Sequence, residues 1–549
     1  MSLVQREHHL LAMFALVCLT LLGFFVFPGH TYLQSDTHIY LPMMERLINP
    51  QLLTNDIIAI HPHLSYTLYD EVAVGIKSIT GLDFQPILQT QQVIARFLGL
   101  IGIYLIATAA CLRPGAAVFV CGLFSLGAFV AGPAVMTVEY EPVPRGTALP
   151  LLLLAMGLAV HSRWTGAAIA SGIAFLYHPP TVWPVWLLLL GYLALPWSEL
   201  EASARRRVRL LFVAAIALLV IASRVQIGER EKQEFFARIP SDLEELQRMR
   251  ASYNWIGIWI GQWWVHYTVL LALSLGAWWR IREELNELSQ LLLVGLPILG
   301  ALSILLSYLL LDIGKWIIIP QAQPGRALMW VTACAILNAG FAAAFAAKRN
   351  RLLESIAWLV IPFCVPVHIR FLELFQSSST LLLTRLGLAL GMAVLAGLLL
   401  RETRQRWAVI AAIIAMFAYP TIGSVTKPAL HNPELDTLSA WARQSTALDA
   451  VFHFPDAGTQ LYPGVFRSRA LRAVWVDYKG GGQVNFTYSL AKEWWRRYSA
   501  TLGHPYEPWP EERYRALPAD YLVLQAVHRR SDEQPVFENS KYLVYKLQP

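Results

Sequence analysis

Carboxyl and guanidinium groups that are capable of chemistry occur in short segments of a chain that is mostly apolar. Asp36 lies in LQSDTHIYLP, and Glu139 and Glu141 lie in VEYEPVPRG, which also contains Arg145. A carboxylate can take up a proton from an attacking group or bind a divalent cation, and an arginine can pair with a phosphate. These four residues are therefore the first candidates for a functional site.

Further polar residues stand at the edges of apolar runs or inside them. His178 lies in FLYHPP, and Gln323 and Arg326 lie in PQAQPGR. Arg385 lies several residues inside an apolar run, where a charge is costly. We therefore expect Arg385 to have a function or a buried partner.

Several of these candidates also have a purely structural explanation. Asp36 can cap the N-terminus of the helix that follows it, and residues 139–141 can be an ordinary solvated loop. His178 precedes two prolines and can satisfy a helix end, whereas Arg326 can anchor at lipid headgroups. The residues by themselves leave these alternatives open.

Composition indicates the kind of protein that must position these residues. The chain has 549 residues, of which 56% are hydrophobic and 15% charged, whereas a water-facing globular protein has about 25% charged residues. The 19 Trp suit a membrane protein, because indole rings gather at the bilayer boundary. The net charge of +7 comes from short basic clusters between apolar runs, so topology explains it better than a nucleic-acid partner.

Apolar runs of bilayer length divide the chain into about thirteen predicted spans. They lie near residues 9–27, 93–112, 116–136, 146–161, 166–180, 181–197, 210–223, 254–279, 288–311, 327–346, 352–372, 380–400 and 407–424. All basic clusters between them fall on one side of the membrane under a single orientation, in which Arg6 is cytoplasmic. An odd number of spans then places the C-terminal part outside.

Two amphipathic helices are predicted on the outer side. The first outer loop, residues 28–92, contains a helical pattern over residues 65–80 that stops at Gly81. A second helix begins at Ser241, where Glu244 completes a capping-box pattern and Leu243, Leu246 and Met249 are expected to point inward.

The chain divides into a membrane domain, residues 1–424, and a small α/β soluble domain, residues 425–549. In the soluble domain DAVFHF, RAVWVDY, DYLVLQA and KYLVYKL have the pattern of strands, and TYSLAKEWWRRYSA has that of a helix. Residues 479–482, Lys-Gly-Gly-Gly, lack the spacing of a phosphate loop, so we expect a strand-to-loop turn there.

This arrangement resembles the GT-C superfamily of membrane glycosyltransferases, such as oligosaccharyltransferases and protein mannosyltransferases, which use lipid-linked sugars. The resemblance rests on an acidic residue just past the first span, a long first outer loop and an acidic pair between the third and fourth spans. The phrases SDTHIYLPMMERL, EYEPVPRG, FLYHPP and PQAQPGRA are similar to those of a bacterial branch of GT-C-like proteins. The usual first motif of the superfamily is Asp-x-Asp, whereas here His38 stands two residues after Asp36.

The resemblance implies an inverting transfer of a sugar from a polyprenyl-phosphate carrier to a glycan, protein or lipid acceptor. It implies a location in the bacterial inner membrane, with the N-terminus in the cytoplasm and the C-terminal domain outside it. The site then lies on the outer face of the membrane, in contact with membrane lipids. Asp36 is the implied base and Glu141 a second catalytic carboxylate, while Glu139 and Glu141 are the implied ligands of Mg²⁺ or Mn²⁺. The implied substrate-binding residues are Arg145, His178, Gln323, Arg326 and Arg385.

Two other classes of function stay open. A GT-C-like chain can serve as a non-catalytic scaffold or subunit of a cell-envelope assembly, because a fold does not decide a function. A lipid or sugar transporter is the third class, but transporters typically carry paired Gly/Pro-broken spans in corresponding halves, and no such pair is evident in the sequence.

Overall fold

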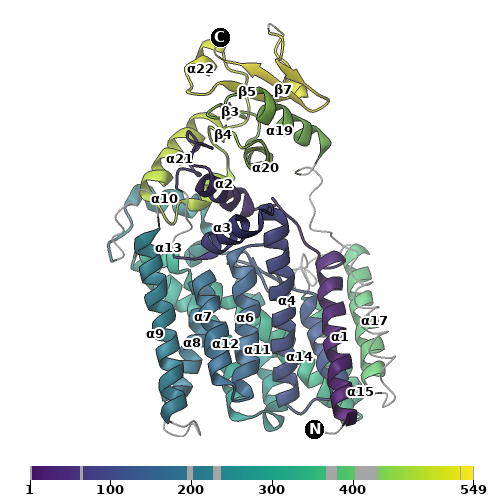
Figure 1. The fold of residues 1–549 in the computed structure, drawn as a ribbon. Helices are drawn as coiled ribbons and strands as arrows, with labels where there is room; N and C mark the ends of the chain where they lie inside the picture. Colours follow the sequence, from purple (N-terminus) through teal and green to yellow (C-terminus); the bar gives the residue numbers. More distant parts are fainter. Residues whose placement is uncertain are drawn as a thin grey trace.

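The computed structural model describes residues 3–61, 66–194, 202–226, 236–365, 380–401, 430, 432–531 and 533–547. Long helices lie side by side in a bundle, and a smaller domain with a sheet sits at one end of it (Figure 1). The helices of the bundle are α1 (Leu3–Phe25), α4 (Phe84–Ala109), α5 (Pro114–Ser125), α6 (Pro144–Val160), α7 (Trp164–Tyr177), α8 (Pro179–Ala194), α9 (Ala202–Val225), α11 (Gly261–Ile281), α12 (Glu287–Ser307), α14 (Leu328–Lys348), α15 (Leu352–Cys364) and α17 (Thr380–Arg401).

Four helical stretches in the described ranges are long and apolar enough to cross a membrane: Phe84–Ala109, Ala202–Val225, Glu287–Ile313 and Ile318–Lys348. Shorter apolar helices accompany them, and the α14 region is buried on all sides within the bundle. The prediction of a multi-pass helical membrane protein is therefore confirmed. The predicted span at 407–424 lies outside the described residues, so the count of thirteen spans stays a prediction.

Glycines allow α4 and α6 to pack backbone against backbone. A Cβ on Gly102 would lie 2.2 Å from the carbonyl carbon of Leu153, and one on Gly157 would lie 2.5 Å from the carbonyl oxygen of Gly102. Small residues at such positions are typical of close helix contacts in membranes. This contact fixes the start of α6, which carries Arg145, relative to α4.

The short helices of the outer loops lie between the bundle and the small domain (Figure 1). They are α2 (Thr37–Ile48), α3 (Tyr69–Thr80) and α10 (Ser241–Arg250). As predicted, α3 ends at Gly81, which has a left-handed φ of +71° and donates its N–H to the carbonyl of Lys77.

The start of α10 is predicted correctly, but two details of that prediction are wrong. Leu243 and Leu246 are buried, whereas Met249 is exposed. The capping box does not form, because Pro240 occupies the N-cap position and Glu244 instead forms ion pairs with Arg248 and Lys315.

The small domain has a five-stranded sheet in the order β4-β3-β5-β7-β6. Its strands are β3 (Val451–His453), β4 (Ala473–Val474), β5 (Tyr521–Gln525), β6 (Phe537–Glu538) and β7 (Tyr542–Lys546). Strand β3 is parallel to β4 and β5, and β7 is antiparallel to β5 and β6. Its helices are α19 (Pro433–Ser445), α20 (Tyr462–Ala470), α21 (Tyr488–Thr501) and α22 (Glu511–Arg515). The four predicted strand segments contain β3, β4, β5 and β7, and the predicted helix is α21.

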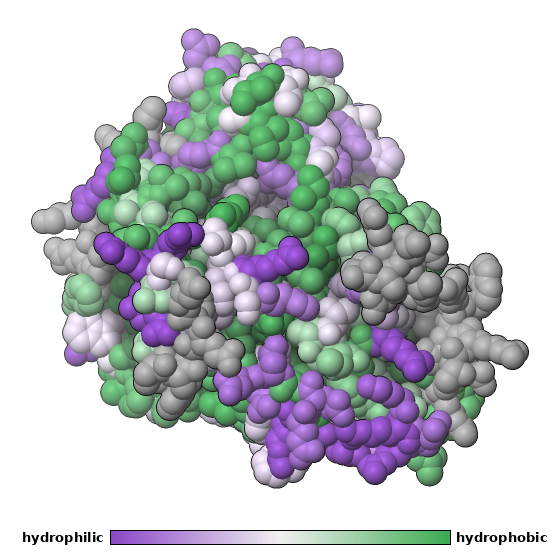
Figure 2. All heavy atoms as spheres, turned by 60° about the horizontal axis from the view of Figure 1, so that its bottom comes forward, coloured by the Kyte–Doolittle hydropathy of each residue, from purple (hydrophilic) through white to green (hydrophobic). Residues whose placement is uncertain are grey.

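Basic residues cluster at the end of the bundle opposite the small domain. There Arg280 at the end of α11 pairs with Glu354 of α15 at 2.5 Å, and Arg349, just after α14, pairs with Glu284 at 2.6 Å. Figure 2 shows hydrophilic side chains gathered toward this end, between apolar sides. Ion pairs therefore connect neighbouring helix ends at the end of the bundle opposite the small domain.

Candidate functional site

A cavity of about 780 Å³ lies at the end of the bundle that carries the small domain. Its wall comes from the starts of α2 and α6, from the end of α7, from α8 and α9, and from the turn after β4. Among its lining residues Asp36 is acidic, and the basic ones are Arg145, Arg250, Arg326 and Lys479. The cavity is therefore positively charged around a single carboxylate.

Asp36 stands at the N-cap position of α2, but its side chain makes no capping hydrogen bond. Its Oδ2 accepts a hydrogen bond from Nη1 of Arg145 at 2.7 Å, and its Oδ1 accepts one from Nζ of Lys479 at 2.6 Å. Burial alone would raise the pKa of Asp36, but Lys479 and Arg145 outweigh burial and hold this pKa well below its ordinary value. The structural alternative of an N-cap thus does not describe this carboxylate, which is ionised and faces the cavity.

Glu141 lies behind Asp36 and acts on its backbone. Its Oε1 accepts the amide N–H groups of Gln34 and Ser35, each at 2.9 Å, and its Oε2 accepts that of Asp36 at 2.9 Å. The amide and hydroxyl of Thr37 also donate to it. Glu141 is buried and is not among the residues that line the cavity. Its position fits an anchor for the loop before α2.

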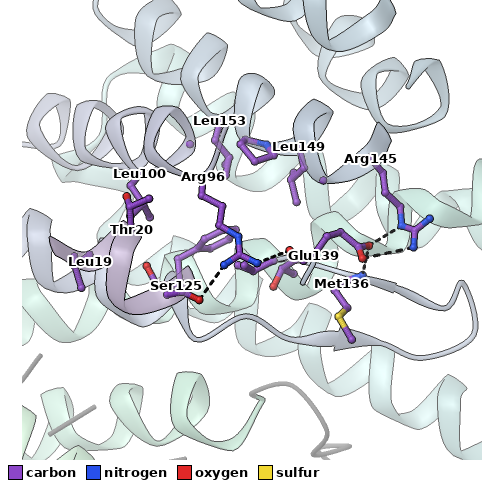
Figure 3. Close-up of a pocket in the computed structure, with 17 residues that line it drawn as sticks. Leu19, Thr20, Arg96, Leu100, Ser125, Met136, Glu139, Arg145, Leu149 and Leu153 are labelled. Atoms are coloured by element: carbon purple, nitrogen blue, oxygen red, sulfur yellow. Dashed lines mark hydrogen bonds and ion pairs between the residues drawn. The ribbon is translucent and has the colours of Figure 1, made fainter. Parts of the chain in front are cut away.

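Glu139 holds the other side of Arg145. Its Oε1 accepts from Nε of Arg145 at 2.6 Å and from the amide of Met136 at 3.1 Å, next to a second cavity of about 40 Å³ (Figure 3). In the wall of this small cavity Arg96 donates to the carbonyl oxygens of Gly23, Gly29 and Glu139. Arg145 is consequently held between two carboxylates, one in each cavity wall.

The acidic residues do not fit the Mg²⁺ or Mn²⁺ site that the sequence resemblance implies. In the described part of the chain no three His, Cys, Asp or Glu side chains are grouped so that they could hold a metal ion. The oxygens of Glu139 and Glu141 are already bonded to Arg145 and to backbone N–H groups. A divalent cation would have to displace these donors and would face the positive charge of the cavity.

His178 and Arg326 meet in the wall of the cavity. Arg326 Nη1 lies 3.3 Å from Nε2 of His178, and Nδ1 of His178 lies 2.7 Å from the hydroxyl of Thr181. A guanidinium only donates hydrogen bonds, so Nε2 of His178 must accept from Arg326. The imidazole is therefore neutral, with Nδ1–H donating to Thr181.

Gln323 also lines the cavity, just before the short 3₁₀ turn η5 (Pro324–Ala327) that carries Arg326. The guanidinium of Arg326 lies 5.8 Å from the ring centroid of Tyr253 rather than at an isolated lipid-facing position. The backbone of Arg385 lies in α17, and its side chain is outside the part of the chain that the structure describes. The substrate-binding role predicted for Arg385 stays a prediction.

The structure thus brings Asp36, Arg145, His178, Gln323 and Arg326 to one cavity, and places Glu139 and Glu141 behind it. Lys479 was not among the predicted site residues, because the sequence of residues 479–482 indicates only a turn. The segment does form a turn, the 3₁₀ turn η6 (Lys479–Gln483), but its first side chain enters the cavity. Arg250 at the end of α10 was also missed.

An apolar wall adjoins the charged residues. Phe175 of α7, Trp183 of α8 and Leu219 of α9 line the cavity together with Phe236. Of these helices, α9 is long and apolar enough to cross a membrane, and α7 and α8 are shorter apolar helices. The cavity therefore has a charged end and an apolar side.

No protein-family model and no curated protein matches the chain. Two solved structures are similar to it: the crystal structures of ArnT from Cupriavidus metallidurans in the apo state and bound to undecaprenyl phosphate. Each is 13% identical in sequence, and the matches cover 98% of this chain and 96% or 97% of ArnT, with TM-scores of 0.45 and 0.46.

Proposed function

We propose that this protein is a membrane glycosyltransferase that moves a sugar from a polyprenyl-phosphate carrier to an acceptor in the cell envelope. The observation that carries the proposal is the two-sided cavity, where a charged end around Asp36 adjoins an apolar wall of bundle helices. A lipid phosphate has the same two parts, an anion and a hydrocarbon tail. A water-soluble sugar phosphate has no hydrocarbon tail that could pack against the apolar wall.

The charged end offers separate places for the phosphate and for the reacting sugar. Arg145 and Arg326 line the cavity and can pair with phosphate oxygens, because a guanidinium presents its donors as a planar fork. The tail lies against Phe175, Trp183 and Leu219. The anomeric carbon then lies between the phosphate and Asp36.

In the proposed inverting transfer a hydroxyl or amide of the acceptor attacks the anomeric carbon. The bond from this carbon to the phosphate oxygen breaks, and the phosphate leaves with the electron pair and stays paired with the arginines. The proton of the attacking group passes to Asp36. Ion pairs with two cations make Asp36 a weak base, so its basicity increases when the incoming phosphate draws Arg145 away.

The proposed mechanism uses no metal ion, because the carboxylates that would hold one are occupied. Arg145, which lies between Glu139 and Asp36, supplies positive charge at the position where the leaving phosphate gains its negative charge. His178 is a positioning residue in this scheme, because it accepts a hydrogen bond from Arg326.

Substitution of Asp36 by Asn tests the proposal. The purified protein is placed in liposomes with a panel of polyprenyl-phosphate-linked sugars and an envelope extract as acceptor, and release of the polyprenyl phosphate is measured. We expect release by the wild type and its loss, by about a hundredfold or more, in Asp36→Asn. Because Asn caps a helix as well as Asp does, an effect on the cap alone would leave the rate unchanged.

Asp83→Asn is the matched control, since Asp83 lies in the same outer loop, is 91% exposed and is outside the cavity lining. It should transfer at the wild-type rate. Equal transfer by Asp36→Asn and wild type would show that Asp36 is not the base. No release from any donor by the wild type would favour the non-catalytic scaffold.

A further inference from the structure

Lys479 of the small domain reaches into the membrane-domain cavity. Its Nζ donates to Oδ1 of Asp36 at 2.6 Å and to the hydroxyl of Ser35 at 2.8 Å, and its side chain is only 16% exposed. The residues are 443 positions apart in sequence. The small domain therefore contributes a side chain to the cavity and does not merely cover it.

The turn that carries Lys479 is shaped by close contacts that only glycine allows. A Cβ on Gly480 would lie 2.7 Å from Ile58, and one on Gly481 would lie 2.4 Å from the ring of Trp494. Trp494 is fully buried and donates its indole N–H to the carbonyl oxygen of Asp477 at 2.7 Å. The glycines thus let the backbone lie flat against Trp494, immediately after Lys479.

A buried cluster of charges ties this turn to the first outer loop. Arg467 of α20 pairs with Asp56 at 2.6 Å and with Asp477 at 2.8 Å, and all three side chains are at most 1% exposed. Asp56 belongs to the first outer loop and also accepts the amides of Ile58 and Val474. Asp477 in turn accepts the amide of Gly480, next to Lys479. The cluster therefore connects the loop that carries Asp36 to the turn that carries Lys479.

Arg250 fixes the same turn from α10. Its Nε donates to the carbonyl oxygen of Tyr478 at 3.0 Å, and its guanidinium lies over the Tyr478 ring at 4.2 Å. Gly464 of α20 lies directly against His38 of α2, where a Cβ would be 2.6 Å from Nδ1. Arg250 thus fixes the backbone just before Lys479, and the close contact at His38 holds α20 against α2.

The charges of the cavity are unbalanced without an anion. Arg145 has carboxylate partners in Asp36 and Glu139. Arg326 and Arg250 pair with no carboxylate among the described residues, and Arg326 Nε is buried without a hydrogen-bond partner there. Buried or confined positive charge of this kind favours an anionic ligand.

We propose that Lys479 is a binding residue for the phosphate of the substrate and that the Asp56–Arg467–Asp477 cluster positions it. The proposal rests on the proposed function and adds that the small domain completes the substrate site. When the phosphate enters, the ammonium group of Lys479 exchanges Asp36 for a phosphate oxygen. This exchange leaves Asp36 free to face the acceptor.

Binding of farnesyl phosphate to the full-length protein in detergent, with inorganic phosphate and farnesol as comparison probes, tests this assignment. We expect Lys479→Met to weaken farnesyl phosphate binding about tenfold or more, as loss of a charged hydrogen bond does, and to leave farnesol binding unchanged. Lys479→Arg keeps the charge and should retain most of the affinity. Lys546→Met, which removes an exposed lysine of β7, is the matched control and should bind as the wild type does.

The outcomes separate this inference from the function on which it rests. Equal farnesyl phosphate binding by Lys479→Met and wild type, together with weaker binding by Arg326→Met, would overturn the role of Lys479 and keep the lipid-phosphate site. Equal loss of farnesol and farnesyl phosphate binding in Lys479→Met would also overturn it, because the lysine would then act on the shape of the cavity. If the wild type binds inorganic phosphate as tightly as farnesyl phosphate, the ligand is a free phosphate. If the wild type binds none of the probes, the proposed function itself is wrong.

Discussion

Glu141 accepts the backbone N–H of Asp36 at 2.9 Å, so that one carboxylate fixes the position of the other. The side chain of Asp36 in turn faces Arg145 and Lys479 in the cavity. The two acidic residues therefore have different tasks, although both were predicted as catalytic. One shapes the loop, and the other presents its charge to the cavity.

Substitution of Glu141 by Gln should destabilise the loop before α2. An amide has a single acceptor oxygen and brings an NH₂ group toward backbone donors, so buried N–H groups lose their partner, at a cost of about 1–3 kcal/mol each. We expect a lower melting temperature in detergent and slower sugar transfer. Glu512→Gln, at an exposed position of α22, should leave both unchanged. A wild-type melting temperature for Glu141→Gln would show that the loop holds its shape without this carboxylate.

Reporter fusions test the orientation of the chain. The basic ends of α11, α14 and α15 lie opposite the small domain, and positive charge marks the cytoplasmic side of a span. A reporter that is active only outside the cytoplasm should be active after Pro549 and silent after Arg207. The reverse pattern would place the cavity in the cytoplasm and remove an outer-face acceptor from consideration.

Much of the cavity follows from the order of spans. Because successive spans alternate in direction, Asp36, Arg145 and His178 at the outer ends of different spans meet at one end of the bundle. The same reasoning brings Arg326 there. The helix end at Gly81 was also predictable, because a glycine in the left-handed conformation commonly ends a helix.

Lys479 and Glu141 show why the rest could not be predicted. Lys479 reaches the cavity only because the small domain docks on the first loop through Arg467 and Asp56, and no local pattern encodes that docking. Sequence can locate Glu141 in a loop, but the direction of its carboxylate depends on the fold of residues 34–37, whose amides it accepts. The lysine followed by three glycines was the one available signal, since such a run marks close backbone packing.

His178 should act as a neutral group that holds Arg326. Its Nε2 accepts a hydrogen bond from the guanidinium of Arg326, which only a neutral imidazole can do, so transfer should show no titration of His178 between pH 6 and 8. A histidine that stays neutral in the folded protein is protonated first in the unfolded chain. The folded protein should therefore lose stability as the pH falls below about 6.5. The pH profiles of transfer and of melting temperature measure these two effects.

The substitution His178→Phe removes the acceptor for Arg326 and keeps a ring of similar size. We expect a raised KM for the lipid substrate, by about tenfold, with a smaller change in kcat, because phosphate binding depends on the position of Arg326. His178→Gln retains an acceptor and should lie closer to the wild type. An inflection near pH 6.5 that disappears in both variants would instead show that His178 takes part in proton transfer.

Gly481 provides a test of the turn that carries Lys479, without changing any charge. Its missing side chain leaves room for the buried ring of Trp494, 2.4 Å from where a Cβ would lie, so alanine there forces the turn and the ring apart. Overpacking of this kind costs about 1–3 kcal/mol.

We expect Gly481→Ala to lower the melting temperature and to weaken farnesyl phosphate binding, because Lys479 moves with the turn. Gly75→Ala in α3 makes the same chemical change where nothing lies within 4 Å. It should leave farnesyl phosphate binding at the wild-type value and should not lower the melting temperature, because alanine favours a helix over glycine. If Gly481→Ala lowers stability but binds farnesyl phosphate as the wild type does, the position of Lys479 does not depend on this turn.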